Sequence, residues 1–278
     1  MSLYKYLKPQ RVDVLNQLMI RFTPPIAFND PFELKPSHEV SKDRAILEEE
    51  AKSELLRKYE ELPSPTKTQL DFESFCQQCP SFLERFRKNI TNPSVVKKFD
   101  EEIERQINRF GILSLTEIKD SLLMWAHYAD SHQGFVMEFD EMNEFFKRNA
   151  NPNAQTGRLI KMSYAHDRPK VVLPGTPGLA ALYCKSKEWE YEREWRITLS
   201  LKDATKVIYT KEGDIHLFEL PPKTIKSVIC GCRMSKCFKS CVRNALKKDY
   251  MSQVKLFEAE IDSAQYTLQM KPVNIKNI

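Results

Sequence analysis

The sequence predicts an α+β fold with a mostly antiparallel or split β core and an inserted helical subdomain. Short segments near the start of the chain and through its second half alternate apolar and polar residues, which is typical of half-buried strands. Between them, residues 38–110 contain no glycine and place apolar residues three and four positions apart, as amphipathic helices do. We therefore expect a single α+β domain over residues 1–278, with a helical insertion at residues 38–110.

Composition and charge predict a cytoplasmic globular protein. Hydrophobic residues make up 41% of the 278 positions, and 43 basic against 38 acidic residues give a net charge of +5. That charge favours an anionic partner only weakly. No run of about 18 apolar residues occurs, so we expect neither a membrane span nor a signal peptide. The seven cysteines lack the regular spacing of a disulfide framework, which indicates a reducing compartment.

The N-terminal part combines two strands with an unusual turn. Strands are expected at residues 3–7 and up to residue 22, with a brief helix between them. The string FNDPFE then places Asn29 and Asp30 before a proline, which disfavours helical backbone and promotes a turn. Two interpretations stay open: a packed turn closed by an Asx hydrogen bond, or a loop that lines a binding site through Asn29 and Asp30.

The glycine-free segment predicts three or four helices, because prolines at positions 63, 65, 80 and 93 interrupt it. Such an insertion can act as a lid or a partner surface, or it can be a solvated cap. A C-x-x-C pair at Cys76 and Cys79 lies within it, and no second pair follows at the spacing of a zinc site.

Residues 111–140 predict a strand, a short helix, a tight turn and a second strand. Residues 112–116 and 135–140 alternate as strands do, and Asp120 or Ser121 can cap a helix between them. Gly134 supplies a residue that tolerates positive φ at the turn. The segment also gathers polar and aromatic side chains within 25 positions, namely Ser114, Thr116, Trp125, His127, Tyr128, Asp130, His132 and Glu138.

After residue 140 the chain is rich in predicted strands. These are expected at residues 158–164, 197–201, 206–210, 215–220, 225–230, 254–260 and 265–270. A loop is expected at 174–178 and a short helix at 179–184. An amphipathic helix is expected from Ser235, its cap, to Lys248, with its basic side chains facing outward.

Several specific strings carry a family resemblance. The opening LYKYL, FNDPFE, LLMWAHYADSHQGFVMEFD and the K-x-x-x-W-x-Y-E-x-E-W-R run from Lys185 to Arg196 resemble the uncharacterised bacterial family called domain of unknown function 2971. The resemblance spans nearly the whole chain outside the helical insertion. It implies no established activity.

A second resemblance, to ADP-ribosyltransferases, concerns mechanism. That family carries an early Arg or His, then a Ser-x-Ser/Thr strand, then a strand with a catalytic Glu, often within Glu-x-Glu. This sequence offers Lys5 with Tyr6, then Ser114-Leu-Thr116, then Glu192-Arg-Glu194, in the same order. Lys5 stands where the family has Arg or His.

This resemblance implies roles for the residues and a co-substrate. Glu194 would be the catalytic carboxylate with Glu192 assisting, Ser114 and Thr116 would position the ribose, and NAD would be consumed, in a toxin or phage-defence setting. A carboxylate suits this chemistry because loss of nicotinamide develops a cation on the ribose. Tyr6 or Tyr128 would stack on nicotinamide. The other substrate contacts that we expect are Lys5, Trp125, His127, Asn29 and Asp30.

Other interpretations stay open. Glu192, Glu194 and Arg196 can also form an ion-pair ladder on a strand surface. A metal-dependent hydrolase or nuclease would use His127, Asp130, His132 and Glu138, which have suitable ligand chemistry without a diagnostic spacing; we expect no metal. A non-catalytic module that binds protein or nucleic acid is the third class, supported by the net charge and the basic helix at 235–248.

Overall fold

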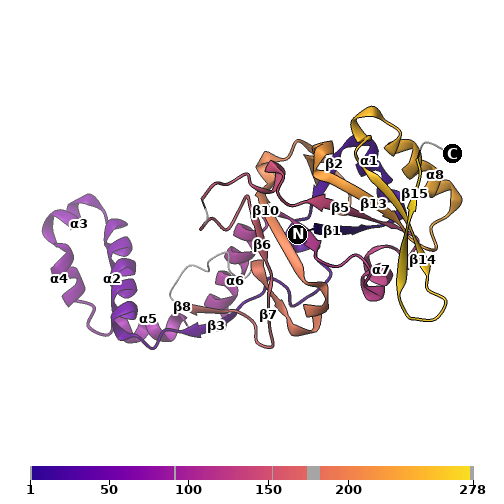
Figure 1. Cartoon of the computed structure of the whole chain (residues 1–278). Coiled ribbons are helices and arrows are strands. Elements are labelled where there is room, and N and C mark those ends of the chain that lie inside the picture. Colours follow the sequence, from indigo (N-terminus) through magenta and orange to yellow (C-terminus); the bar gives the residue numbers. More distant parts are fainter. Residues whose placement is uncertain (1, 91, 152, 174–181, 276–278) are drawn as a thin grey trace. The chain divides into compact units, whose positions relative to one another are not determined.

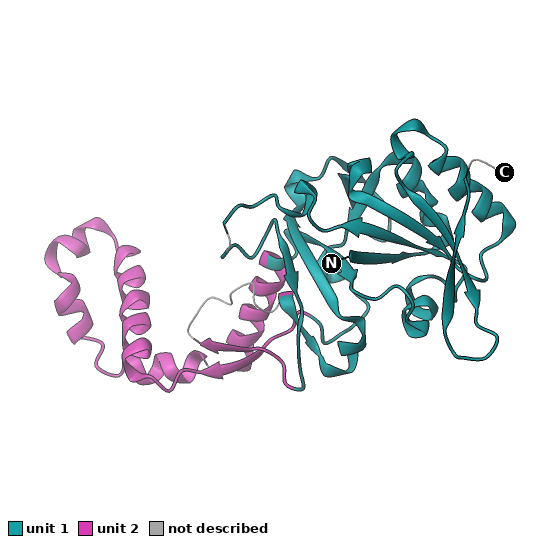
Figure 2. Cartoon of the chain, in the orientation of Figure 1, with its two compact units in different colours: residues 1–33, 107–166, 183–278 teal, residues 34–106, 167–182 magenta. Residues whose placement is uncertain are grey.

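An eight-stranded sheet is the central element of the structure, a computed structural model that describes residues 2–90, 92–151, 153–173 and 182–275. The chain forms two compact units (Figure 2). The first unit contains the sheet and is made of Met1–Glu33, Ile107–His166 and Tyr183–Ile278. The second unit is made of Leu34–Gln106 and Asp167–Leu182.

The sheet confirms the α+β fold with a mostly antiparallel core. Its strand order is β15-β14-β13-β5-β1-β4-β10-β6, and only the β13–β14 pair is parallel (Figure 1). The strands are β1 (Ser2–Leu7), β4 (Phe110–Thr116), β5 (Phe135–Asp140), β6 (Leu159–Lys161), β10 (Glu194–Ser200), β13 (Ile225–Cys230), β14 (Lys255–Ile261) and β15 (Leu268–Val273).

Alternation along β1 divides the core of the first unit between the two faces of the sheet. Leu3 and Leu7 pack into the larger cluster with α1 (Asp13–Gln17) and α8 (Lys236–Leu246). Tyr4 and Tyr6 pack into the smaller cluster with α7 (Leu122–Tyr128). Ser235 caps α8 by accepting a hydrogen bond from the Phe238 N–H, as expected.

The sheet opens between β1 and β4. These strands share a single register pair, Tyr4 with Thr116, whereas β4 and β10 pair over seven residues and β1 and β5 over six. Nearer the start of β4, the same edge of the strand pairs with the residue after β2 (Met19–Phe22) instead of with β1. Thr23 and Ile112 exchange both backbone hydrogen bonds there, each at 2.9 Å. Ser114 lies between these two contacts, so β4 borders an opening lined by β1 and β2.

Smaller sheets and turns complete the first unit. Strand β2 pairs with β12 (Ile215–Glu219), which pairs with β11 (Lys206–Ile208), and β7 (Ser163–Ala165) runs parallel to β9 (Cys184–Ser186). The 3-10 helices are η1 (Pro9–Val12), η2 (Pro25–Ala27), η3 (Glu144–Phe146), η5 (Lys187–Glu192), η6 (Leu201–Asp203), η7 (Pro222–Thr224) and η8 (Asp249–Met251).

Two of the strand predictions differ from the structure by more than a shift of strand ends. The strand expected at 158–164 is two strands, β6 and β7, because the chain leaves β10 after Met162 and pairs with β9. The last strand begins at Leu268 rather than at position 265. The Asp262 carboxylate accepts hydrogen bonds from the N–H groups of Ala264 and Gln265, which closes a turn over those positions.

The second unit contains more helices than the prolines indicated. In its described residues they are α2 (Arg44–Glu60), α3 (Ser64–Gln69), α4 (Phe72–Gln77), α5 (Phe82–Ile90) and α6 (Pro93–Ile107). The prediction was three or four helices. Pro65 does not interrupt a helix as expected but stands in the first turn of α3, where proline is tolerated. The unit also includes β3 (Ser37–Val40) paired in parallel with β8 (Lys170–Leu173), a segment beyond the expected insertion at 38–110. The expected loop at 174–178 and the start of the helix at 179–184 lie outside the described residues.

Candidate functional site

A cavity of about 470 Å³ lies in the first unit where the sheet opens. Residues of β1, the end of β2, the loop through Glu33, β4, α7 and the β9–η5–β10 segment line it. These segments are far apart in the sequence, and the strand pairing brings them together. Its lining includes polar, charged and aromatic side chains, so the cavity can hold a ligand with more than one kind of group.

The register of β4 and β10 sets the pattern of the cavity wall. Glu194 pairs with Thr116 and Arg196 pairs with Ser114. Directly opposed residues project from the same face of a sheet, so the hydroxyl residues of β4 stand beside the charged residues of β10. Leu113 and Leu115 point to the other face and pack into the larger core cluster. All four polar residues line the cavity.

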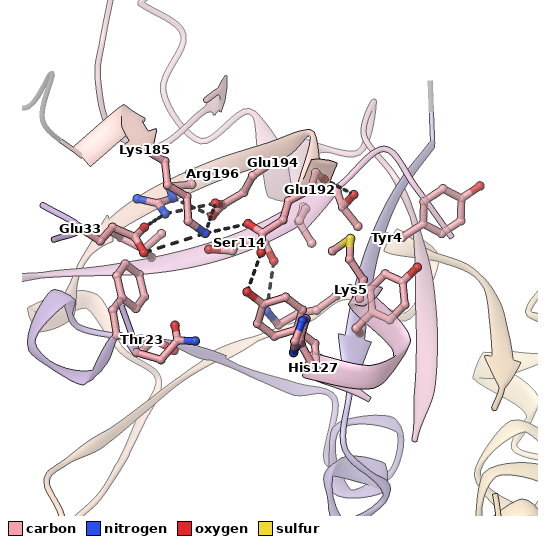
Figure 3. A pocket seen from close by; sticks show the side chains of 18 of the residues that line it. Tyr4, Lys5, Thr23, Glu33, Ser114, His127, Lys185, Glu192, Glu194 and Arg196 are labelled. Atoms are coloured by element: carbon pink, nitrogen blue, oxygen red, sulfur yellow. Dashed lines mark hydrogen bonds and ion pairs between the residues drawn. The ribbon is translucent and has the colours of Figure 1, made fainter. Parts of the chain in front are cut away.

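Five charged side chains form a buried cluster at this wall, and each exposes 6% or less of its side chain. Arg196 Nε lies 2.7 Å from Glu194 Oε1, and Arg196 also donates to Glu33. Lys185 Nζ lies 2.7 Å from Glu192 Oε2 and 3.4 Å from Glu194 Oε2 (Figure 3). Lys185 thereby joins the two carboxylates of the Glu-x-Glu string.

The turn between η5 and β10 places Glu192 next to Glu194. Arg193, between them, has a φ of 43°, a left-handed conformation that reverses the chain at the end of η5. The Thr116 hydroxyl donates to the Glu192 carbonyl at 2.5 Å, and the Tyr128 hydroxyl donates to Glu192 Oε1 at 2.5 Å. Glu192 is therefore held by its backbone and by both carboxylate oxygens.

The cluster carries an excess of negative charge, because three carboxylates face two cations. Burial raises the pKa of Glu194, against the opposing influence of Lys185 and of a hydrogen bond from Ser114. Burial alone would lower the pKa of Lys185, but Glu194 and Glu192 outweigh it and the net shift is upward. Both shifts favour the protonated form of the group concerned, so Lys185 keeps its positive charge between the two carboxylates.

Positive side chains outside the buried cluster also line the cavity. Lys5 projects from β1 into the opening of the sheet, and its Nζ donates to the Ser114 carbonyl at 3.0 Å. Burial lowers its pKa to about 8, although Glu194 favours the charged form. Lys8 and Arg21 also line the cavity. The Arg21 guanidinium has a pKa lowered by burial and then by Arg11.

Part of the chain matches a known protein family. The family model described as Protein of unknown function (DUF2971) matches residues 124–197. This match confirms the family resemblance over residues 124–197, and the strings LYKYL and FNDPFE lie outside the matched residues. No curated protein and no solved structure matches the chain. The DUF2971 segment runs from α7 into β10 and includes Tyr128, Lys185, Glu192, Glu194 and Arg196.

The structure brings most of the expected site residues to the cavity. Glu192, Glu194 and Tyr128 line it from within the DUF2971 segment, together with His127, whose side chain is largely exposed. From outside the segment it is lined by Lys5, Tyr6, Ser114, Thr116 and Asn29.

Two expected residues do not line it. Trp125 is fully buried in the smaller core cluster, where its indole N–H donates to the Lys119 carbonyl at 3.0 Å and its ring packs edge-on against Tyr6. It supports the cavity wall from behind. Asp30 accepts a hydrogen bond from the Phe32 N–H at 2.9 Å, so it closes an Asx turn as the alternative interpretation of that loop proposed.

Sequence reasoning missed Glu33, Lys185 and Arg196 as parts of the site, and it missed Lys8 and Arg21 entirely. Glu33 ends the string FNDPFE, and Lys185 and Arg196 begin and end the string K-x-x-x-W-x-Y-E-x-E-W-R. Their membership of these two specific strings could have identified them as site residues. The alternative interpretation of Glu192, Glu194 and Arg196 as a ladder on a strand surface is wrong in its location, because all three residues are buried.

The residues weighed as metal ligands do not converge. Glu138 accepts a hydrogen bond from the Ser227 hydroxyl within the sheet at 2.5 Å, and His132 stacks on Trp125. Across the described residues no group of three histidine, cysteine or acidic side chains is placed to hold a metal ion. Cys76 and Cys79 are free thiols.

The basic helix is less available than its sequence indicated. Lys239 and Arg243 both bind Glu258 of β14, Arg243 at 2.7 Å, so the acidic residue offsets part of the positive face of α8. Separately, none of the helices in the described ranges is both long and apolar enough to cross a membrane.

Proposed function

We propose that the protein cleaves the bond between nicotinamide and ribose in NAD and passes the ADP-ribosyl group to water or to an acceptor, in a toxin or phage-defence setting. The observation that supports this most is the shared position of Glu194 and Ser114. They come from neighbouring strands and line one cavity with Glu192 and Thr116. This is the arrangement that the order of the motifs implied.

The excess negative charge of the cluster suits the reaction. As the C1′–N bond breaks, its electron pair leaves with nicotinamide and the ribose develops a positive charge. A fixed carboxylate beside the ribose stabilises that charge, and it acts more strongly away from bulk water. Water or an acceptor then forms the new bond to C1′ and loses a proton to solvent. Glu194 is the carboxylate proposed for this role, with Glu192 assisting.

Thr116 and Ser114 have different roles in this proposal. The Thr116 hydroxyl is already engaged, because it donates to the Glu192 carbonyl and accepts from the Ile118 N–H at 3.0 Å. Thr116 is therefore a positioning residue that fixes Glu192. Ser114 has its hydroxyl beside Glu194 and can contact the ribose. Tyr128 and Tyr6 offer aromatic rings in the same cavity on which nicotinamide can stack.

An assay of NAD consumption by the full chain tests the proposal. The wild type should release nicotinamide, and Glu194→Gln should release it about a hundred-fold or more slowly, because the variant lacks the charge that stabilises the transition state. Glu190→Gln is a matched control, since Glu190 is exposed on η5 and pairs with Lys187. Absence of NAD turnover and of NAD binding by the wild type would overturn the proposal.

A further inference from the structure

The cavity is also lined by basic side chains outside the buried cluster of five charged residues. Lys5, Lys8 and Arg21 all line it, and within the described ranges none of the three forms a hydrogen bond or ion pair with a carboxylate. The acidic residues of the cavity are instead occupied by Lys185 and Arg196. The cavity is thus lined both by a cluster with excess negative charge and by three cations that, among the described residues, no carboxylate contacts directly, although Glu194 acts on Lys5 through its charge.

The geometry of the sheet explains why these cations gather. Strand β4 meets β1 only at Thr116, and it meets the end of β2 at Ile112. Lys5 comes from β1, Lys8 follows the end of β1, and Arg21 lies on β2 two residues before the contact with β4. The three side chains therefore surround the opening from its two separate borders.

Arg21 has a buried donor that is left unused. Its Nε atom is inaccessible to solvent and, in the described part of the chain, has no hydrogen-bond partner. A guanidinium with an unpaired buried donor is unfavourable, and a ligand whose oxygens accept hydrogen bonds from that guanidinium offsets part of this cost. The guanidinium has the planar donor geometry that binds phosphate oxygens well.

We infer that Lys5, Lys8 and Arg21 form a binding site for the diphosphate group of the substrate. This deepens the proposed function and depends on it for the identity of that substrate, a dinucleotide whose ribose lies at Glu194. The diphosphate carries two adjacent negative charges, which three neighbouring cations can bind. The site is distinct in chemistry from the carboxylate cluster, which would repel the same group.

Titration calorimetry of the full chain with inorganic pyrophosphate tests the inference. We expect saturable binding that weakens as NaCl is raised, because salt screens the attraction of exposed and half-exposed charges. Arg21→Gln and Lys8→Gln should each weaken it about ten-fold or more, the effect of losing a charge-assisted hydrogen bond. Arg233→Gln and Lys206→Gln remove one charge each from exposed positions outside the cavity and should leave it unchanged.

Further binding measurements distinguish failure of the diphosphate site from failure of the proposed NAD reaction. Orthophosphate should bind more weakly than pyrophosphate, and ADP-ribose should compete with pyrophosphate for one site. Pyrophosphate binding that depends on Arg21 and Lys8, in a protein that does not consume NAD, would support the site and refute the NAD reaction. Absence of pyrophosphate binding by the wild type, or equal losses in the control variants, would overturn the site. Circular dichroism spectra should match among the variants, and Lys8, which is exposed, gives the reading least affected by folding.

Discussion

The hydroxyl of Tyr128 donates a hydrogen bond of 2.5 Å to the carboxylate of Glu192, a residue 64 positions later in the chain. Burial and then the charge of Glu192 raise the pKa of Tyr128, so the phenol stays protonated and remains a donor. Helix α7 thereby fixes one oxygen of Glu192 while Lys185 binds the other. The arrangement leaves the carboxylate little freedom to rotate.

Tyr128→Phe tests what this hydrogen bond does. The variant should lose roughly 1.5–3 kcal/mol of stability, the usual value for a hydrogen bond to a charged group. If Glu192 assists the reaction, the rate at saturating NAD should fall more than the apparent affinity does. Urea unfolding and steady-state kinetics measure the two effects. Tyr266→Phe, at a nearly fully exposed position, is the control, and an equal loss of stability there would contradict the interpretation.

Lys185 should be among the residues most important for stability. Lys185→Met leaves Glu192 and Glu194 buried beside each other without their shared cation, and breaking a buried pair in this way costs roughly 3–5 kcal/mol. Lys187→Met removes an exposed lysine paired with Glu190 and should change stability by about 0.5 kcal/mol or less. Denaturant unfolding gives both values. Similar small losses in the two variants would mean that the cluster does not depend on Lys185.

The backbone conformation of Arg193 predicts that a glycine variant at this position is more stable than a valine variant. A left-handed backbone costs an ordinary residue roughly 1–2 kcal/mol, and glycine avoids that cost. Because Arg193 has a φ of 43° and an exposed side chain, Arg193→Gly should be at least as stable as the wild type. Arg193→Val should be less stable, since a β-branched residue fits this region worst. Thermal unfolding that ranks the valine variant above the glycine variant would refute this account of the turn.

Lys5 should give the protein a pH-dependent stability in the alkaline range. Its pKa is lowered from 10.5 to about 8 in the folded chain, mainly by burial. Between these pH values the unfolded chain binds more protons at Lys5 than the folded chain does, so folded stability rises with pH across that window. Below it the contribution is constant and unfavourable.

The difference in unfolding free energy between wild type and Lys5→Met isolates this effect from other groups. The unfolding free energy of the wild type should rise relative to that of Lys5→Met between about pH 8 and about pH 10.5, and the difference should stay constant at lower pH. Lys206→Met, which removes an exposed lysine of β11, controls for the lost charge. Parallel stability curves for wild type and Lys5→Met would show that Lys5 is not held in an unfavourable charged state.

Local patterns predicted much of this fold. Strands β5 and β13 begin and end where alternation placed them, and Ser235 caps α8, because these features depend on neighbours in the sequence. Trp125 was misplaced because spacing identifies the residues that share a helix face without showing whether that face meets a ligand or the core.

Features set by strand register could not be predicted. The opening of the sheet follows from β4 pairing with β1 at one position and with the end of β2 at another, and no local pattern specifies that choice. Lys8 and Arg21 therefore gave no signal as cavity residues. Glu33 and Arg196, 163 positions apart, form a buried pair that depends on the same tertiary arrangement.

The most direct test of the account is the rate of nicotinamide release by Glu194→Gln at saturating NAD, compared with wild type and Glu190→Gln. If Glu194 stabilises the transition state, Glu194→Gln should still bind NAD and should release nicotinamide about a hundred-fold or more slowly, while Glu190→Gln should match the wild type. Nicotinamide release by Glu194→Gln at the wild-type rate would contradict it.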